Sequence, residues 1–136
     1  MKQTCDNCGK NGCTYPESIT SCEWEQKTLL TEYQKDVLRT KNNELSHIDQ
    51  LTNAAIGAAG ESGELSELVK KHRYQGHDFN REKYIDETGD ALFYLTLGLL
   101  EIGSSLEEAI CCNVKKRENI YPDGFDAERS RGRKRE

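Results

Sequence analysis

IDQLTNAAIGAAGESGELSELVKKHR, residues 48–73, is the stretch that decides the fold. Its apolar residues recur at helical spacing and predict one long amphipathic helix. The stripe consists of Leu51, Ala55, Ala58, Leu65, Leu68 and Val69. The same stretch contains Gly57, Gly60 and Gly63, and each interior glycine costs a helix about 1 kcal/mol relative to alanine. Glycines at this cost indicate either close approach by another helix or space for a ligand.

Three further helices are predicted around this one. The first covers residues 28–41, with Leu29, Leu30, Tyr33 and Val37 at helical spacing. The next covers residues 82–103, and the last begins at the capping box of residues 105–108 and ends at the turn of residues 121–124. No β-type alternation longer than a few residues is present. Four helices with short connections predict an all-α domain, a four-helix bundle over residues 28–125.

The helix predicted over residues 82–103 is apolar on almost every side. One stripe, which is expected to face the core, consists of Ile85, Leu92, Leu95, Leu99 and Ile102. Three more apolar residues lie on other faces, namely Phe93, Leu97 and Leu100. A helix that is apolar all round is buried on more than one side. Because the chain is small, these three residues predict burial by a second subunit, in a homodimer or homotetramer.

Composition excludes several classes of protein. The chain has 136 residues, enough for one core, and a net charge of −5, which argues against a general nucleic-acid binder. Its longest apolar run, residues 91–100, is shorter than the ~20 residues that cross a bilayer. The N-terminus is polar and lacks the features of a secretory signal. We therefore expect a cytoplasmic protein without membrane or nucleic-acid partners.

The two ends of the chain differ from the middle. Residues 1–27 form a cysteine-rich extension with the spacing C-x2-C-x4-C-x8-C, made by Cys5, Cys8, Cys13 and Cys22. Four thiolates this close together can hold a structural Zn²⁺; an iron-sulfur cluster and free thiols are the alternatives. Cys111 and Cys112 are interpreted as buried or interfacial thiols. Residues 126–136 are expected to form a mobile charged tail.

Two acidic pairs carry the functional prediction. Glu61 with Glu64, and Glu87 with Asp90, are each spaced three residues apart, so each pair lies on one helix face. If the two helices face each other, four carboxylates come together, and their mutual repulsion requires a cation. Hard carboxylate oxygens suit Mg²⁺ or Mn²⁺. The alternative for either pair alone is an ordinary solvated helix face.

The motifs resemble those of the MazG-like, all-α nucleoside triphosphate pyrophosphohydrolases, in particular the short single-domain members often encoded by bacteriophages. The resemblance covers about residues 30–130. It is carried by GAAGESGEL at 57–65, Lys70 and Lys71, ETGDALFY at 87–94, NVKK at 113–116 and YPDGF at 121–125. Two positions depart from the family pattern, because Ile120 stands where relatives often have arginine and Arg117 where they favour leucine.

This resemblance implies a fold, a reaction and a set of site residues. The expected reaction converts a nucleoside triphosphate and water to the monophosphate and pyrophosphate with Mg²⁺, in the host cytoplasm if the protein is phage-encoded. It assigns Glu61, Glu64, Glu87 and Asp90 to the metal. The substrate-binding candidates are Lys71, Asn113, Lys116 and Arg117. The alternatives are a dimeric dUTPase-like or phosphoribosyl-ATP pyrophosphohydrolase-like enzyme of the same fold, or a non-catalytic zinc-bearing interaction module.

Overall fold

The computed structural model describes residues 23–132, and this part of the chain is all-helical, without strands. Its helices are α1 (Glu23–Thr40), α2 (His47–Gln75), α3 (Arg81–Glu101), α4 (Leu106–Ile120) and the short α5 (Ala127–Gly132). The predicted all-α class is thus confirmed. The four candidate zinc ligands, Cys5, Cys8, Cys13 and Cys22, lie outside the described residues. Within residues 23–132, no helix has both the length and the apolar composition needed to span a membrane.

Side-chain caps fix where the helices begin. Ser46 precedes α2 and its hydroxyl accepts a hydrogen bond from the Asp49 amide at 3.3 Å. Asn80 does the same for α3 with the Lys83 amide at 2.9 Å, and Ser105 for α4 with the Glu108 amide at 3.1 Å. These caps satisfy amides that have no partner within the helix. The Ser105 cap also confirms the helix start predicted there, whereas the Glu108 carboxylate accepts from the Ser104 hydroxyl at 2.7 Å.

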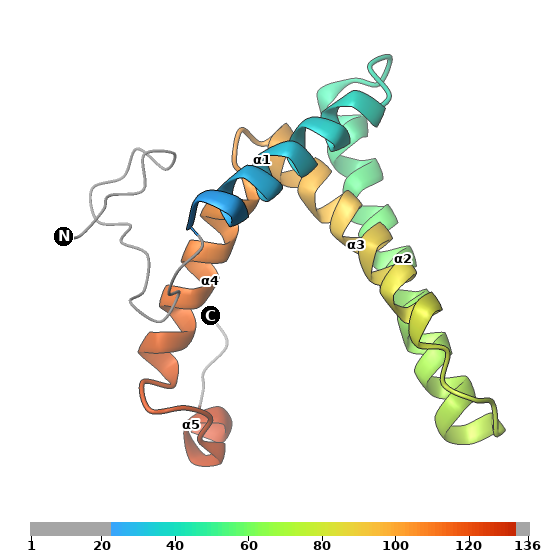
Figure 1. The fold of residues 1–136 in the computed structure, drawn as a ribbon, viewed down its shortest axis with the longest axis vertical. Coiled ribbons are helices and arrows are strands. Elements are labelled where there is room, and N and C mark those ends of the chain that lie inside the picture. Colours follow the sequence, from blue (N-terminus) through green and yellow to red (C-terminus); the bar gives the residue numbers. More distant parts are fainter. Residues whose placement is uncertain (1–22, 133–136) are drawn as a thin grey trace.

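The helices form an open V rather than a closed bundle within one chain (Figure 1). α2 and α3 run antiparallel as a hairpin and make one arm. α1 crosses the apex and contacts α3 and α4, and α4 descends as the other arm. The most extensive helix pairing is between α2 and α3. This hairpin is therefore the frame on which the two acidic pairs are placed.

The core lies at the apex of the V, where α1, α2 and α3 meet. Val37, Ala54 and Leu97 are buried there, and Phe93 and Leu100 pack against them. Leu97 is therefore buried by its own chain, without a second subunit, whereas Phe93 and Leu100 are only partly buried there. Whether the protein forms the expected homodimer or homotetramer stays a prediction. The stripe assigned to the core is largely exposed instead, at Ile85, Leu92, Leu95 and Ile102. Because α3 is apolar nearly all round, its periodicity could not identify the face that packs on α2.

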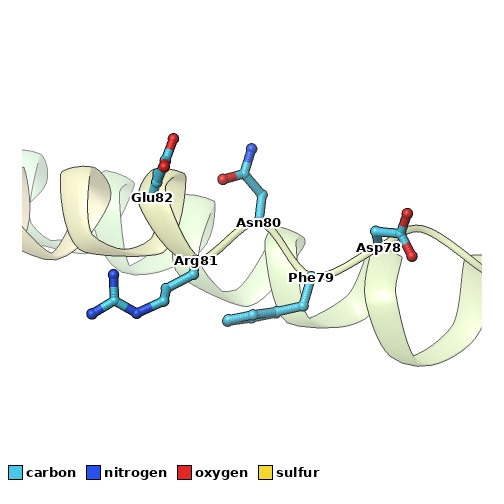
Figure 2. Close-up of a pocket in the computed structure, with 5 residues that line it drawn as sticks. All are labelled: Asp78, Phe79, Asn80, Arg81 and Glu82. Atoms are coloured by element: carbon cyan, nitrogen blue, oxygen red, sulfur yellow. The ribbon is translucent and has the colours of Figure 1, made fainter.

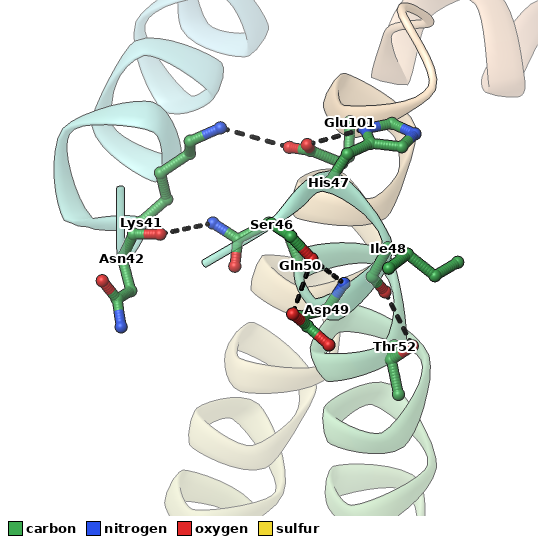
Figure 3. A network of polar contacts seen from close by, with 9 residues as sticks. All are labelled: Lys41, Asn42, Ser46, His47, Ile48, Asp49, Gln50, Thr52 and Glu101. Carbon is green, nitrogen blue, oxygen red and sulfur yellow. Dashed lines mark hydrogen bonds and ion pairs between the residues drawn. The ribbon is translucent and has the colours of Figure 1, made fainter. Parts of the chain in front are cut away.

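A polar network holds the apex together (Figure 3). Glu101 at the end of α3 accepts from Lys41 at 3.1 Å and contacts His47 Nδ1 at 2.9 Å. The hydrogen bond with His47, followed by that with Lys41, lowers the pKa of Glu101. Buried Gln50 donates to the carbonyl of Asn42 at 3.0 Å. The start of α2 is thereby tied to the end of α3 and to the loop that follows α1.

The C-terminal segment contains a helix that the sequence did not predict. Asp126 precedes α5, and its side chain accepts a hydrogen bond from the Arg129 amide at 2.7 Å. The aspartate therefore serves as a helix cap within the segment interpreted as a charged tail. α5 has six residues, none of which is buried.

Cys111 is buried, as predicted, whereas Cys112 is exposed.

Candidate metal centre

Small residues bring α2 and α3 close together next to the acidic pairs. A methyl group built at Gly98 would lie 3.4 Å from the Ala54 side chain. At Gly57 the approach is closer still, because a methyl group there would lie 2.3 Å from the ring of Tyr94. No alanine side chain could share that space with the ring. Gly57 is therefore the seat in which Tyr94 of α3 lies against α2, which is the close approach that was one of the two alternatives for the glycines.

The acidic residues meet one helical turn beyond this seat. Glu61 follows Gly57 by four residues, and Asp90 precedes Tyr94 by four. Because residues four apart lie on the same helix face, the Gly57–Tyr94 contact aligns these carboxylates across the hairpin. One carboxylate oxygen from each of Glu61, Glu87 and Asp90 lies within 4.8 Å of the other two. The structure thus brings together three of the four predicted ligands.

The fourth predicted ligand, Glu64, is placed differently. Its side chain is exposed, as that of Asp90 also is, but it does not belong to the set of oxygens that lie within 4.8 Å of one another. Its charge nevertheless contributes to raising the pKa of Glu61. Glu64 therefore lies at the edge of the cluster, where it influences the electrostatic potential without sharing the central position.

Crowding of like charges makes the cluster unfavourable without a cation. The pKa of Glu61 is raised first by desolvation, then by the charge of Asp90 and by a hydrogen bond and charge from Glu87. Glu87 is 9% exposed, so it is not part of an ordinary solvated face. Carboxylate oxygens at this spacing suit a hard divalent ion such as Mg²⁺ or Mn²⁺. The donor set therefore fits the predicted metal.

Two residues near the cluster were not among the predicted site residues. Lys83 lies one turn before Glu87, and its Nζ is 3.3 Å from the Glu87 carboxylate. Tyr33 of α1 has its pKa raised by burial, then by the charges of Asp36 and Asp90. The spacing of Lys83 and Glu87, four residues apart on a helix, could have identified the first. No local sequence pattern indicates that Tyr33 lies near the cluster, because its position depends on how α1 crosses the apex.

The predicted substrate-binding residues lie apart from the acidic cluster. Asn113, Lys116 and Arg117 are exposed on α4, which belongs to the other arm of the V (Figure 1). Lys71 lies on α2 and pairs with Glu67 at 3.5 Å. One chain therefore does not bring the α4 residues to the carboxylates.

No family model, curated protein or solved structure matches this chain. The functional assignment consequently depends on the residues themselves and on their geometry.

Replacing Gly57 tests whether the helix approach assembles the cluster. In Gly57→Ala the new methyl group must displace the Tyr94 ring, which should separate Glu61 from Asp90. We expect Mn²⁺ affinity, measured by calorimetry, to fall at least about tenfold, since site geometry of this kind tolerates shifts of only about 0.5 Å. Gly60→Ala is the matched control, because a methyl group there meets nothing within 4 Å. Equal Mn²⁺ affinity in the two variants would show that the Gly57–Tyr94 contact does not assemble the cluster.

Proton competition should make metal binding depend on pH. Because the pKa of Glu61 is raised in the fold, a proton occupies this carboxylate up to a higher pH than in the unfolded chain. The metal-free protein should therefore lose stability as pH rises through that pKa, whereas Mn²⁺ affinity should rise and then level off. Glu61→Gln should show a higher melting temperature than wild type in chelator at pH 7 and a smaller stabilisation by Mn²⁺. A lower melting temperature for folded Glu61→Gln would show that the like-charge repulsion is absent.

Proposed function

We propose that the protein is a metal-dependent nucleotide pyrophosphohydrolase, which converts a nucleoside triphosphate to the monophosphate and pyrophosphate. The observation that carries the proposal is the meeting of Glu61, Glu87 and Asp90 across the hairpin. These residues belong to the same two motifs on which the MazG-like resemblance depends. A site for a hard cation and a sequence pattern of nucleotide hydrolases therefore point to the same chemistry.

The proposed role of each residue follows from its position. Glu61, Glu87 and Asp90 would hold the cation, and Lys83 offsets part of the charge of Glu87. When bound, Mg²⁺ supplies charge neutralisation for the triphosphate and lowers the pKa of a water molecule. The Tyr94 ring, seated on Gly57, closes the hairpin one turn above the carboxylates and keeps them at fixed spacing. Glu64, at the edge, is not required for holding the cation.

Substitution of the carboxylates tests this assignment. Glu61→Gln and Asp90→Asn should each lower kcat/KM for pyrophosphate release by at least about 10²-fold, the effect of removing one key electrostatic group. Glu64→Gln is the matched control on the same helix and should lower kcat/KM less than about tenfold, because Glu64 lies outside the central set. A panel of ribo- and deoxyribonucleoside triphosphates identifies the preferred base and tests the dUTPase-like alternative.

Two experimental outcomes would contradict the proposal. If folded Glu61→Gln and Asp90→Asn both retained wild-type rates, the three carboxylates would not be the metal site. If orthophosphate were released in place of pyrophosphate, the position of bond cleavage would be wrong.

We further propose that the active site is completed by a second copy of the chain. α4 carries Asn113 and Lys116 on the arm opposite the acidic cluster, so they can reach it only from another subunit in this arrangement. The hairpin also exposes apolar residues on α3, at Ile85, Leu92 and Leu95. Exposed apolar surface of this kind marks an interaction site. Two open V-shaped chains would bury these residues and complete a four-helix bundle between them.

Subunit complementation tests the shared site. Asp90→Asn and Lys116→Ala should each be impaired alone, whereas chains co-expressed with different tags should recover about a quarter of the wild-type activity. This fraction arises because half of randomly assembled dimers are mixed, and each mixed dimer has one intact site of two. Co-expressed Asp90→Asn and Glu61→Gln are the control and should recover nothing, because both changes fall in one cluster. No recovery with Lys116→Ala would contradict a site shared between two chains.

A further inference from the structure

The tip of the α2–α3 hairpin is basic, although the chain as a whole is acidic. Residues 70–84 contain five basic residues, Lys70, Lys71, Arg73, Arg81 and Lys83. Only two acidic residues, Asp78 and Glu82, lie in the same range. The lysines pair with Glu67 or Glu87. Among the described residues, Arg73 and Arg81 form no ion pair with a carboxylate, so the tip offers two guanidinium groups to an anion.

A recess of about 440 Å³ lies at this tip and is lined by residues 78–82. Figure 2 shows that Phe79 and Arg81 project to one side of the turn, whereas Asn80 and Glu82 project to the other. Arg81 therefore projects to the same side of the turn as Phe79 and away from Glu82. An aromatic ring and a cation thus lie on the same side of the turn, and the carboxylates of Asp78 and Glu82 complete the lining of the recess.

The backbone of the tip is held in place by several contacts. Gly76 ends α2 in the left-handed conformation, at φ 73°, and its amide donates to the carbonyl of Lys71. His72 Nδ1 lies 2.9 Å from the carbonyl oxygen of His77, which closes the turn further. The Asn80 cap fixes the first turn of α3. The position of the recess is therefore defined before any ligand binds.

The ring of Phe79 is also fixed, yet remains partly exposed. It lies edge-on to His72 at a centroid distance of 5.7 Å and tilted to Tyr84 at 5.6 Å. Even so, 44% of Phe79 is accessible. Nearby Tyr74 is 80% exposed, with the Arg73 guanidinium 6.0 Å from its ring centroid. Aromatic rings held at the surface next to guanidinium groups are the usual means of binding unpaired bases.

We propose that this recess binds a nucleotide unit, with the base stacked on Phe79 and the phosphate paired with Arg81. A nucleotide combines a planar face with an anion, and the recess presents a complement to each. An acidic peptide would pair with Arg81 but leave the Phe79 face without a stacking partner. The expectation of no nucleic-acid partner came from net charge, which averages over this local basic surface.

The recess is distinct in position from the acidic cluster. Arg81 precedes Glu87 by six residues on α3, which corresponds to about 9 Å along the helix axis. In the absence of a divalent ion, the carboxylates repel phosphate, so binding measured in chelator reports on the tip. The proposal therefore does not depend on the hydrolytic function, and the two can fail separately.

The test is calorimetric titration in chelator and low salt, with ATP and with a short single-stranded oligodeoxythymidylate as separate probes. Phe79→Leu retains an apolar side chain without the aromatic face, and Arg81→Gln removes the charge; each should weaken binding about tenfold or more. Phe79→Tyr should retain binding. Phe125→Ala is the matched control, because Phe125 is 78% exposed but lies after α4, at the far end of the other arm. It should leave the affinity unchanged.

Each outcome supports or overturns the proposal. Tighter binding of the oligonucleotide identifies a single strand as the natural source of the nucleotide unit, and tighter binding of ATP identifies a free nucleotide. No binding of either probe, or binding that Phe79→Leu and Arg81→Gln leave unchanged, overturns the proposal. Inorganic tripolyphosphate that binds as tightly as ATP would overturn it as well, because the base would then contribute nothing. So would a change of oligomeric state in Phe79→Leu with no probe bound, since a second copy would then cover the tip.

Discussion

The contact between Gly57 and the Tyr94 ring is the constraint on which the rest of the site depends. A side chain on α2 at this point would collide with the ring, so only glycine allows the Tyr94 ring to lie here against α2. The approach costs helix propensity on α2, at about 1 kcal/mol for an interior glycine. In return, it aligns Glu61 with Asp90 one turn away. Helix separation, rather than any single ligand, therefore determines whether the carboxylates can act together.

The same geometry explains why the apo site is under electrostatic stress. Desolvation and neighbouring negative charges raise the pKa of Glu61, and Lys83 neutralises only Glu87 directly. A stable fold tolerates this repulsion because the hairpin is anchored elsewhere, at the apex network of Glu101 and His47 and in the core around Leu97.

Local rules explain how much of this could be predicted from the sequence. Periodicity and caps located four helices. Of the three glycines of α2, Gly57 lies in a close helix contact, whereas a methyl group at Gly60 or Gly63 would meet nothing within 4 Å. The face of α3 was assigned wrongly, since Ile85 and Leu92 are exposed while Leu97 is buried. The sequence of a helix that is apolar on every side does not indicate which face packs. The close contact of this face involves small residues, Gly98 and Ala54, which contribute little to a hydrophobic stripe. Helical spacing placed Glu64 and Glu61 on one face, but spacing cannot distinguish a central carboxylate from one at the edge.

The sequence also could not predict where α4 lies relative to the α2–α3 hairpin. Short loops suggested neighbouring helices, whereas the turn after Glu101 directs α4 away from α2 and leaves an open V. The apolar stripe on α3 and the separated α4 residues are two consequences of that single turn. A second copy would account for both.

The most direct test of the central claim is an anomalous difference map from crystals soaked in Mn²⁺. The account predicts a peak between the carboxylates of Glu61, Glu87 and Asp90, and no such peak in crystals of Gly57→Ala. A Mn²⁺ peak elsewhere, with none among these three carboxylates in the wild-type protein, would contradict it.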